Sequence, residues 1–161
     1  MSIGTCHYAL AHDEGEAVWF LGALATIKAG RTQTGNAAFA VVEFTLPPGF
    51  APPPHIHHME DEAFFILEGS ATGTCGDEQW EAEPGSFIWL PRGVAHGFKV
   101  GTDGPLKVFQ ITAPAGFDEF VKEVGEPAPS RTLPVQSPPD IEKLNAAAAK
   151  VGIEHLGPPP D

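Results

Sequence analysis

The sequence is short of cysteines, of basic residues and of long apolar runs, and each shortage excludes a class of protein. Cys6 and Cys75 are the two cysteines among 161 residues, without the density of a disulfide scaffold or the paired spacing of a zinc site, so we expect ordinary thiols. Nine Lys and Arg against 21 Asp and Glu give a formal net charge of -12, the wrong sign for binding nucleic acid or an anionic membrane. No apolar stretch reaches the ~20 residues of a membrane-spanning helix, and Met1–Leu10 lacks a basic region followed by an apolar run. We therefore expect a cytoplasmic protein that binds neither nucleic acid nor membranes.

Glycine and proline, by contrast, are abundant, with 18 and 17 residues, and both interrupt helices. The length fits a single domain, which we take to span residues 1–161. Runs of β-branched and aromatic residues between turn residues predict about eight short strands, a pattern typical of an all-β sandwich or closed barrel. The expected strands are residues 17–27, 37–46, 62–67, 71–75, 78–82, 86–90, 95–100 and 106–112.

Residues 114–161 differ in character from the strand-rich region. Phe117–Val124 predicts a short helix, and residues 126–139 form a Pro-rich connector that we expect to be extended. Asp140 can cap a final helix. The apolar residues of this helix recur at three- and four-residue spacing, so they form one stripe that we expect to pack on the barrel or on a second subunit. They are Ile141, Leu144, Ala147, Ala148 and Val151.

Two histidines separated by one residue form the most informative feature of the sequence. In a strand, residues i and i+2 point to the same face, so His55 and His57 would direct their imidazoles to one point. A turn through residues 58–61 would bring the chain back antiparallel, so that Glu62 could add a carboxylate from the neighbouring strand. His96, after a strand and a Pro/Gly turn, could supply a third nitrogen. Three imidazoles and one carboxylate suit Mn, Fe, Co, Ni, Cu or Zn and leave one or two coordination positions open.

These residues resemble the two motifs of the cupin superfamily. The first motif reads Gly49, five residues, His55-x-His57, a short gap, Glu62, six residues and Gly69. The second reads Gly85, five residues, Pro91-x-Gly93, two residues and His96. Many members carry Asn where this chain has Val100, a position that is not a ligand. The resemblance implies a cupin double-stranded β-helix (jelly-roll barrel) over residues 17–113 with short C-terminal helices, and one divalent transition-metal ion on His55, His57, Glu62 and His96.

A closer resemblance is to the single-domain bacterial cupins grouped with quercetin 2,3-dioxygenase. It is carried by Val18–Gly22, Pro47–Gly49, His55–His58, Asp61–Phe64 and Phe65–Gly69. It implies that dioxygen cleaves the ring of a flavonol or another aromatic enol with release of carbon monoxide, and that Glu62 is both metal ligand and proton acceptor. Two alternatives stay open: a non-oxidative metal-dependent isomerase, cyclase or lyase, and a non-catalytic module that binds a small ligand.

The apolar residues of the strands predict a cavity beside the metal that would suit a flat aromatic substrate. The residues that we expect to line it are Phe44, Phe64, Ile66, Phe87, Trp89, Phe98 and Phe109. We interpret His58 and Glu60 as parts of a solvated rim, and His155 as an exposed residue. We also predict a homodimer, because sheet edges invite pairing, with the strand around Trp19 and the C-terminal helix between the subunits.

Overall fold

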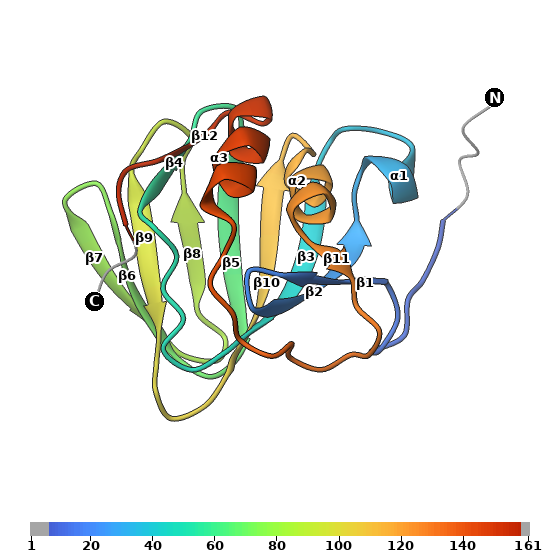
Figure 1. Cartoon of the computed structure of the whole chain (residues 1–161), viewed down its shortest axis with the longest axis horizontal. Coiled ribbons are helices and arrows are strands. Elements are labelled where there is room, and N and C mark those ends of the chain that lie inside the picture. Colours follow the sequence, from blue (N-terminus) through green and yellow to red (C-terminus); the bar gives the residue numbers. More distant parts are fainter. Residues whose placement is uncertain (1–6, 159–161) are drawn as a thin grey trace.

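The computed structural model describes residues 7–158 and shows two antiparallel β-sheets with three short helices (Figure 1). The seven-stranded sheet contains, in spatial order, β11 (Glu126–Pro127), β1 (Glu16–Phe20), β2 (Ala23–Ala29), β3 (Ala40–Leu46), β10 (Leu106–Ala113), β5 (Asp61–Glu68) and β8 (Phe87–Leu90). The five-stranded sheet contains β12 (Ile153–His155), β4 (His55–His57), β9 (His96–Val100), β6 (Ala71–Cys75) and β7 (Glu78–Ala82). The helices are α1 (Arg31–Thr34), α2 (Phe117–Val124) and α3 (Ile141–Lys150). The all-β prediction is confirmed.

The first expected strand is wrong in one respect, because residues 17–27 form a hairpin rather than one strand. Leu21 and Gly22 both have positive φ angles, 50° and 81°, which is the backbone of a two-residue hairpin turn. β1 and β2 pair on either side of this turn, from Phe20 opposite Ala23 to Glu16 opposite Ile27. A leucine rarely adopts positive φ, so the apolar run concealed the turn.

Other local predictions are confirmed. The expected strands 71–75 and 78–82 form as β6 and β7, which pair as a hairpin around Gly76 at a φ of 57°. The side chain of Asp140 caps α3 by accepting a hydrogen bond from the backbone N–H of Lys143 at 3.0 Å. The short elements α1, β11 and β12 were not predicted, since two to four residues carry too little periodicity to be recognised. Cys6 lies outside the described residues, and Cys75 is a free, partly exposed cysteine.

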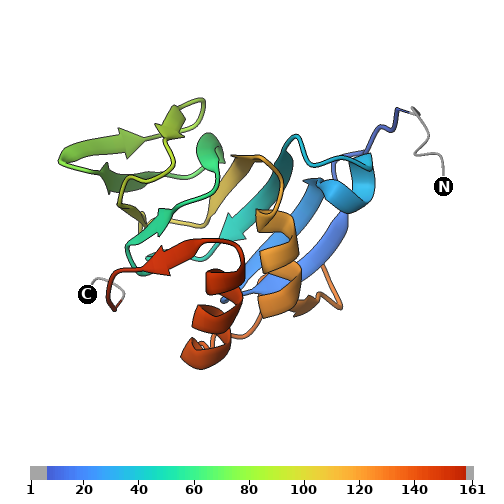
Figure 2. The same ribbon diagram turned by 90° about the horizontal axis from the view of Figure 1, so that it is seen from above.

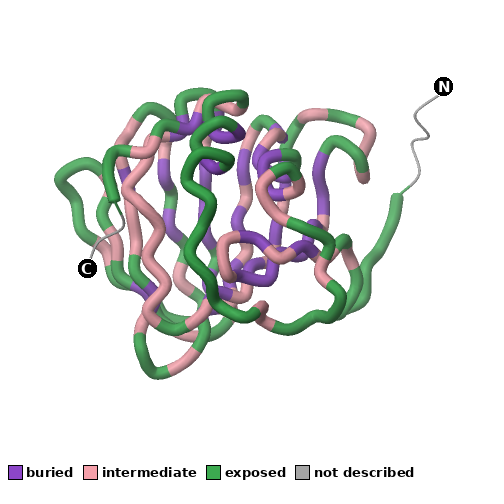
Figure 3. The backbone as a smooth tube through the Cα atoms, in the orientation of Figure 1, coloured by how far each residue is buried: buried purple, intermediate pink, exposed green. Residues whose placement is uncertain are grey.

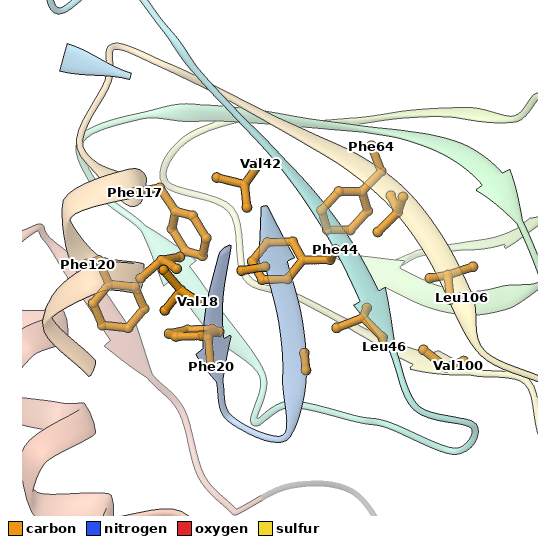
Figure 4. Packing of buried hydrophobic residues seen from close by; sticks show 14 of the residues in the cluster. Val18, Phe20, Val42, Phe44, Leu46, Phe64, Val100, Leu106, Phe117 and Phe120 are labelled. Carbon is orange, nitrogen blue, oxygen red and sulfur yellow. The ribbon is translucent and has the colours of Figure 1, made fainter. Parts of the chain in front are cut away.

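The hydrophobic core lies between the two sheets and continues under α2. Aromatic rings from three elements meet there: the Phe20 ring contacts those of Phe44, Phe117 and Phe120, with centroids 5.6–6.3 Å apart (Figure 4). Figure 3 shows buried segments along the central strands and exposed ones along the connector that leads to α3. Each such ring contributes on the order of 2–3 kcal/mol through burial, so this aromatic cluster fixes α2 against the seven-stranded sheet.

The C-terminal elements cover one side of the sheets. α2 packs on β1, β3 and α3, and β12 extends the five-stranded sheet by pairing with β4 (Figure 2). Within residues 7–158, no helix has the length and apolar character needed to cross a bilayer.

Candidate metal centre

The four predicted ligands come from three strands and from both sheets. His55 and His57 lie on β4, and His55 is directly opposite His96 of β9 in the five-stranded sheet. Glu62 lies on β5 of the seven-stranded sheet. The expectation that Glu62 comes from a strand next to the histidines in one sheet is therefore wrong. The turn after β4 carries the chain across to the facing sheet, so the ligands meet between the sheets.

The structure brings all four residues to one point. One potential ligand atom from each residue lies within 4.8 Å of the others. Glu62 Oε2 is 3.1 Å from His57 Nε2 and 3.1 Å from His96 Nε2. These contacts lack hydrogen-bond geometry, and the three atoms are buried without a hydrogen-bond partner among residues 7–158. Buried polar atoms normally have partners, so three that share one point indicate a site for a group that would satisfy them together.

The other ring nitrogen of each histidine is already engaged. Nδ1 of His55 and Nδ1 of His96 lie 2.9 and 3.2 Å from the backbone carbonyl two residues earlier in the chain. Nδ1 of His57 lies 2.8 Å from Oε1 of Glu60. Acceptors at these positions favour the tautomer with the proton on Nδ1, which leaves the Nε2 lone pair free. This is the arrangement that metal-binding histidines usually have.

The carboxylate of Glu62 is held from its other side. Gln110 of β10 donates a hydrogen bond from Nε2 to Oε1 of Glu62, which leaves Oε2 facing the imidazoles. Burial raises the pKa of Glu62, but the three imidazoles outweigh burial and lower the pKa to about 2. Burial also lowers the pKa of His55 to about 4. At neutral pH the site therefore presents an ionised carboxylate beside a neutral His55 imidazole.

Three imidazole nitrogens and one carboxylate oxygen fit a divalent transition-metal ion such as Mn, Fe, Co, Ni, Cu or Zn. All four side chains are anchored by strands, and their remaining donors and acceptors are satisfied by Gln110, Glu60 and the backbone. The residues present thus fit the ion that the sequence predicted.

Two residues near the site lie elsewhere than predicted. Glu60 is 4% exposed and supports His57, so its assignment to a solvated rim is wrong. Burial raises the pKa of Glu60, an effect that its contact with His57 partly offsets. His155, expected to be exposed, is partly buried opposite His55 on β12, and burial lowers its pKa. His58 is exposed as expected and pairs with Glu154 at 2.8 Å.

A largely apolar cavity begins at the metal centre and is lined by residues of both sheets. Its volume is about 80 Å³. His55, His57 and Glu62 line its polar end, together with Gln110 and His155. The walls include Phe44, Phe64, Ile66 and Phe98 from the predicted set, and Phe20, Phe50, Trp80, Phe117, Phe120, Leu144 and Ile153, which were not predicted.

Three residues of the predicted pocket lie outside it. Phe87 and Trp89 are 62% and 56% exposed on β8, while Ile88 and Leu90 are buried. Phe109 is partly exposed, since its neighbours Val108 and Gln110 occupy the inward positions of β10. Their predicted interior placement is wrong because alternation allows only every second residue of a strand to face the cavity.

The inward residues of β10 contain the signal for one functional residue that the sequence analysis missed. Leu106, Val108, Gln110 and Thr112 share the buried face, so alternation alone would have placed the amide of Gln110 in the core. Glu60 and His155 had no such signal, because their positions depend on a turn and on a three-residue strand.

Comparison with known proteins identifies a domain within the chain. Residues 42–112 match the family model described as cupin domain, which includes all four ligands. This part of the chain is a cupin domain. The resemblance inferred from its two motifs and the predicted jelly-roll fold are thereby confirmed.

Curated relatives of this chain include quercetin 2,3-dioxygenase of Bacillus subtilis (strain 168), which is 26% identical over 133 residues. The match covers 83% of this chain and 39% of that protein. The chain spans less than two thirds of the length of three curated relatives that it matches, this one included.

Solved structures agree on the fold. An RmlC-like cupin from Shewanella frigidimarina NCIMB 400 has a TM-score of 0.58 at 15% identity, covering 71% of this chain and 96% of the other. KdgF from Halomonas sp. has a TM-score of 0.53 at 20% identity, covering 61% and 85%. At such identities the likeness shows the shared barrel.

Proposed function

We propose that this cupin is a metal-dependent dioxygenase that opens the ring of a flavonol or a related aromatic enol. The observation that carries the proposal is the group of three buried, unpartnered atoms, His57 Nε2, His96 Nε2 and Glu62 Oε2, at the end of an apolar cavity. The likeness to the Bacillus subtilis quercetin 2,3-dioxygenase supports the reaction class.

A divalent metal held by the four ligands would lower the pKa of an enolic hydroxyl and bring the substrate and dioxygen together. Glu62 is the one carboxylate among the residues that line the cavity, so it is our candidate proton acceptor. Gln110 fixes its Oε1 and leaves Oε2 facing the imidazoles, where the ion and the substrate hydroxyl would meet. Because its pKa is about 2, Glu62 stays ionised and accepts a proton only from a strongly acidified hydroxyl.

The walls of the cavity determine what can enter. Phe44, Phe64 and Phe98 offer flat apolar surfaces, which favour an aromatic ring over a charged metabolite and exclude water from the reacting bond. His155 adds a polar group at the metal end of the cavity, where its ring lies 6.1 Å from that of His55. Its Nδ1 lies 3.1 Å from Oδ1 of Asn145, and its Nε2 has no hydrogen-bond partner within the described chain, so it can bind a second oxygen of the substrate.

The test is to load the protein with Mn, Fe, Co, Ni or Cu, add a flavonol under air, and follow oxygen uptake and loss of the long-wavelength flavonol absorption. We expect turnover with at least one metal, and no turnover for His57→Ala. His58→Ala is the matched control, because it removes an adjacent but exposed histidine. No flavonol loss with any of the five metals would reject the dioxygenase assignment and favour non-oxidative chemistry.

A further inference from the structure

Gln110 approaches Glu62 from the middle of the seven-stranded sheet. It lies on β10, which pairs with β3 on one side and β5 on the other, and it is 6% exposed. Its partner in register on β5 is Phe64, two residues from Glu62 and on the same face of the sheet. Diagonal neighbours of this kind lie about 7–8 Å apart, within reach of a long side chain. Two flanking strands therefore fix the point from which the amide of Gln110 reaches Glu62.

The hydrogen bond between these two side chains has only one possible direction. Glu62 is ionised at neutral pH because its pKa is about 2, and an ionised carboxylate only accepts. Of the two ends of the Gln110 amide, only Nε2 donates, and it donates to Oε1 of Glu62. Both residues are buried, so water does not compete for this bond, and a bond to a charged acceptor is about twice as strong as a neutral one. Gln110 thus holds one of the two carboxylate oxygens firmly.

The other oxygen of Glu62, Oε2, is left for the ion. It lies 3.1 Å from Nε2 of His57 and 3.1 Å from Nε2 of His96. A carboxylate binds a metal through one oxygen or through both, and the second bond would require Oε1 to turn away from Gln110. Three nitrogens and one oxygen leave two positions open on an ion that takes six ligands, whereas a carboxylate bound through both oxygens leaves one. The contact with Gln110 therefore decides how many positions remain for a substrate.

We propose that Gln110 is a positioning residue that limits Glu62 to a one-oxygen contact with the ion and so keeps two coordination positions open toward the cavity. Under the proposed function, on which this role rests, Gln110 selects the substrate class. Two open positions admit an aromatic substrate that binds through a hydroxyl oxygen and an adjacent carbonyl oxygen, as a flavonol can, whereas a single position admits only one of these oxygens. His55, His57 and Glu62 line the cavity, so a substrate inside it approaches the ion from that side.

Two small probes distinguish two open positions from one. Tropolone is a flat aromatic compound that binds metals through adjacent hydroxyl and carbonyl oxygens, whereas azide binds through one atom. We expect both probes to bind the cobalt-loaded full chain. Gln110→Met, which keeps the length of the side chain and removes its amide, should weaken tropolone binding at least tenfold and azide binding less than threefold, because the freed Oε1 of Glu62 takes one of the two positions. Titrations followed by the visible absorption of cobalt give both dissociation constants.

Val42→Ala is the matched control for loss of packing. Val42 is 1% exposed and lies opposite Gln110 on β3, so its truncation leaves a cavity and lowers the unfolding midpoint while the amide of Gln110 stays in place. Both probes should bind this variant as they bind the wild type. Gln110→Asn is a second test variant, because its amide is one methylene too short to hold Oε1 of Glu62. It should lose tropolone binding as Gln110→Met does.

Infrared difference spectra between the cobalt-loaded and metal-free proteins give a readout that packing alone does not move. The separation between the two carboxylate stretching bands should be wide in the wild type and narrow in Gln110→Met, as is usual when both oxygens bind a metal. Equal losses of tropolone and azide binding, a loss of cobalt binding itself, or an unchanged tropolone affinity in both Gln110 variants would overturn the role of Gln110. Neither probe is a flavonol and neither measurement needs turnover, so a failed flavonol assay rejects the dioxygenase assignment without bearing on the one-oxygen contact.

Discussion

The segment between His55 and Glu62 has two sides that carry the same residue types in opposite environments. On the inner side, His57 and Glu62 are each 2% exposed and leave unpartnered atoms at one point. On the outer side, His58 pairs with Glu154 in solvent and Asp61 pairs with Arg92. Residue identity alone therefore does not mark the metal centre. What marks it is the strand phase that turns one histidine inward and its neighbour outward.

The largest contrast should be between the two adjacent histidines. Loss of the His57 imidazole removes one of three nitrogen ligands and leaves Glu62 and Glu60 buried without their shared partner. We expect His57→Ala to weaken metal binding by at least two orders of magnitude, measured by competition with a chromogenic chelator. His58→Ala should change that affinity less than twofold. Equal losses in both variants would mean that the inner and outer sides do not differ in metal binding.

Glu60 permits a finer comparison, since it belongs to the inner side without being a ligand. Its carboxylate accepts the Nδ1 proton of His57 at 2.8 Å and thereby orients the ring. Groups in this position typically contribute 10–100-fold to metal affinity. We expect Glu60→Ala to lose about tenfold or more in affinity, and Glu60→Gln to recover most of the loss because its amide oxygen still accepts a hydrogen bond.

The readout for Glu60 is the metal dissociation constant together with the unfolding midpoint of the metal-free protein. A purely structural role would lower the midpoint in both variants and leave the affinity of the folded protein unchanged. A Glu60→Gln variant as defective as Glu60→Ala would show that the negative charge, rather than ring orientation, is what His57 needs.

The metal ligands of the inner side could be predicted where a short stretch of sequence determines them. His55 and His57 follow from strand alternation alone, and the spacing to Glu62 and His96 follows from motif resemblance. The sheet that supplies Glu62 could not be predicted from the sequence, because a turn can return the chain to the same sheet or carry it to the facing one. Phe87 and Trp89 were misplaced because every residue of β8 is apolar. Alternation of apolar and polar residues therefore could not show which side chains of this strand face inward. Long-range packing, which buries Glu60 and His155, has no local signature.

Burial of His55 on the inner side should make the stability of the metal-free protein depend on pH. The pKa of His55 is about 4 in the folded chain, compared with its ordinary value of 6.5. Between pH 6.5 and pH 4, His55 is therefore protonated in the unfolded chain and neutral in the folded one. The free energy of unfolding accordingly falls as the pH falls through this range. We expect the metal-free wild type to lose about 2 kcal/mol more unfolding free energy than His55→Phe between pH 7 and pH 4.5. Urea unfolding at both pH values measures this. Equal losses would contradict burial of a neutral His55.

The smallest effect belongs to His155, which lines the cavity without reaching the metal ligands' meeting point. Its ring is 6.1 Å from that of His55, so His155→Phe keeps an aromatic wall and removes one hydrogen-bonding nitrogen. A lost hydrogen bond of about 1 kcal/mol corresponds to a several-fold change, and we expect KM for a flavonol to rise by about that factor with metal affinity unchanged. An unaltered KM would show that the substrate does not contact His155. A loss of metal affinity would instead place His155 among the groups that hold the ion, and the inner side of the site would then extend to β12.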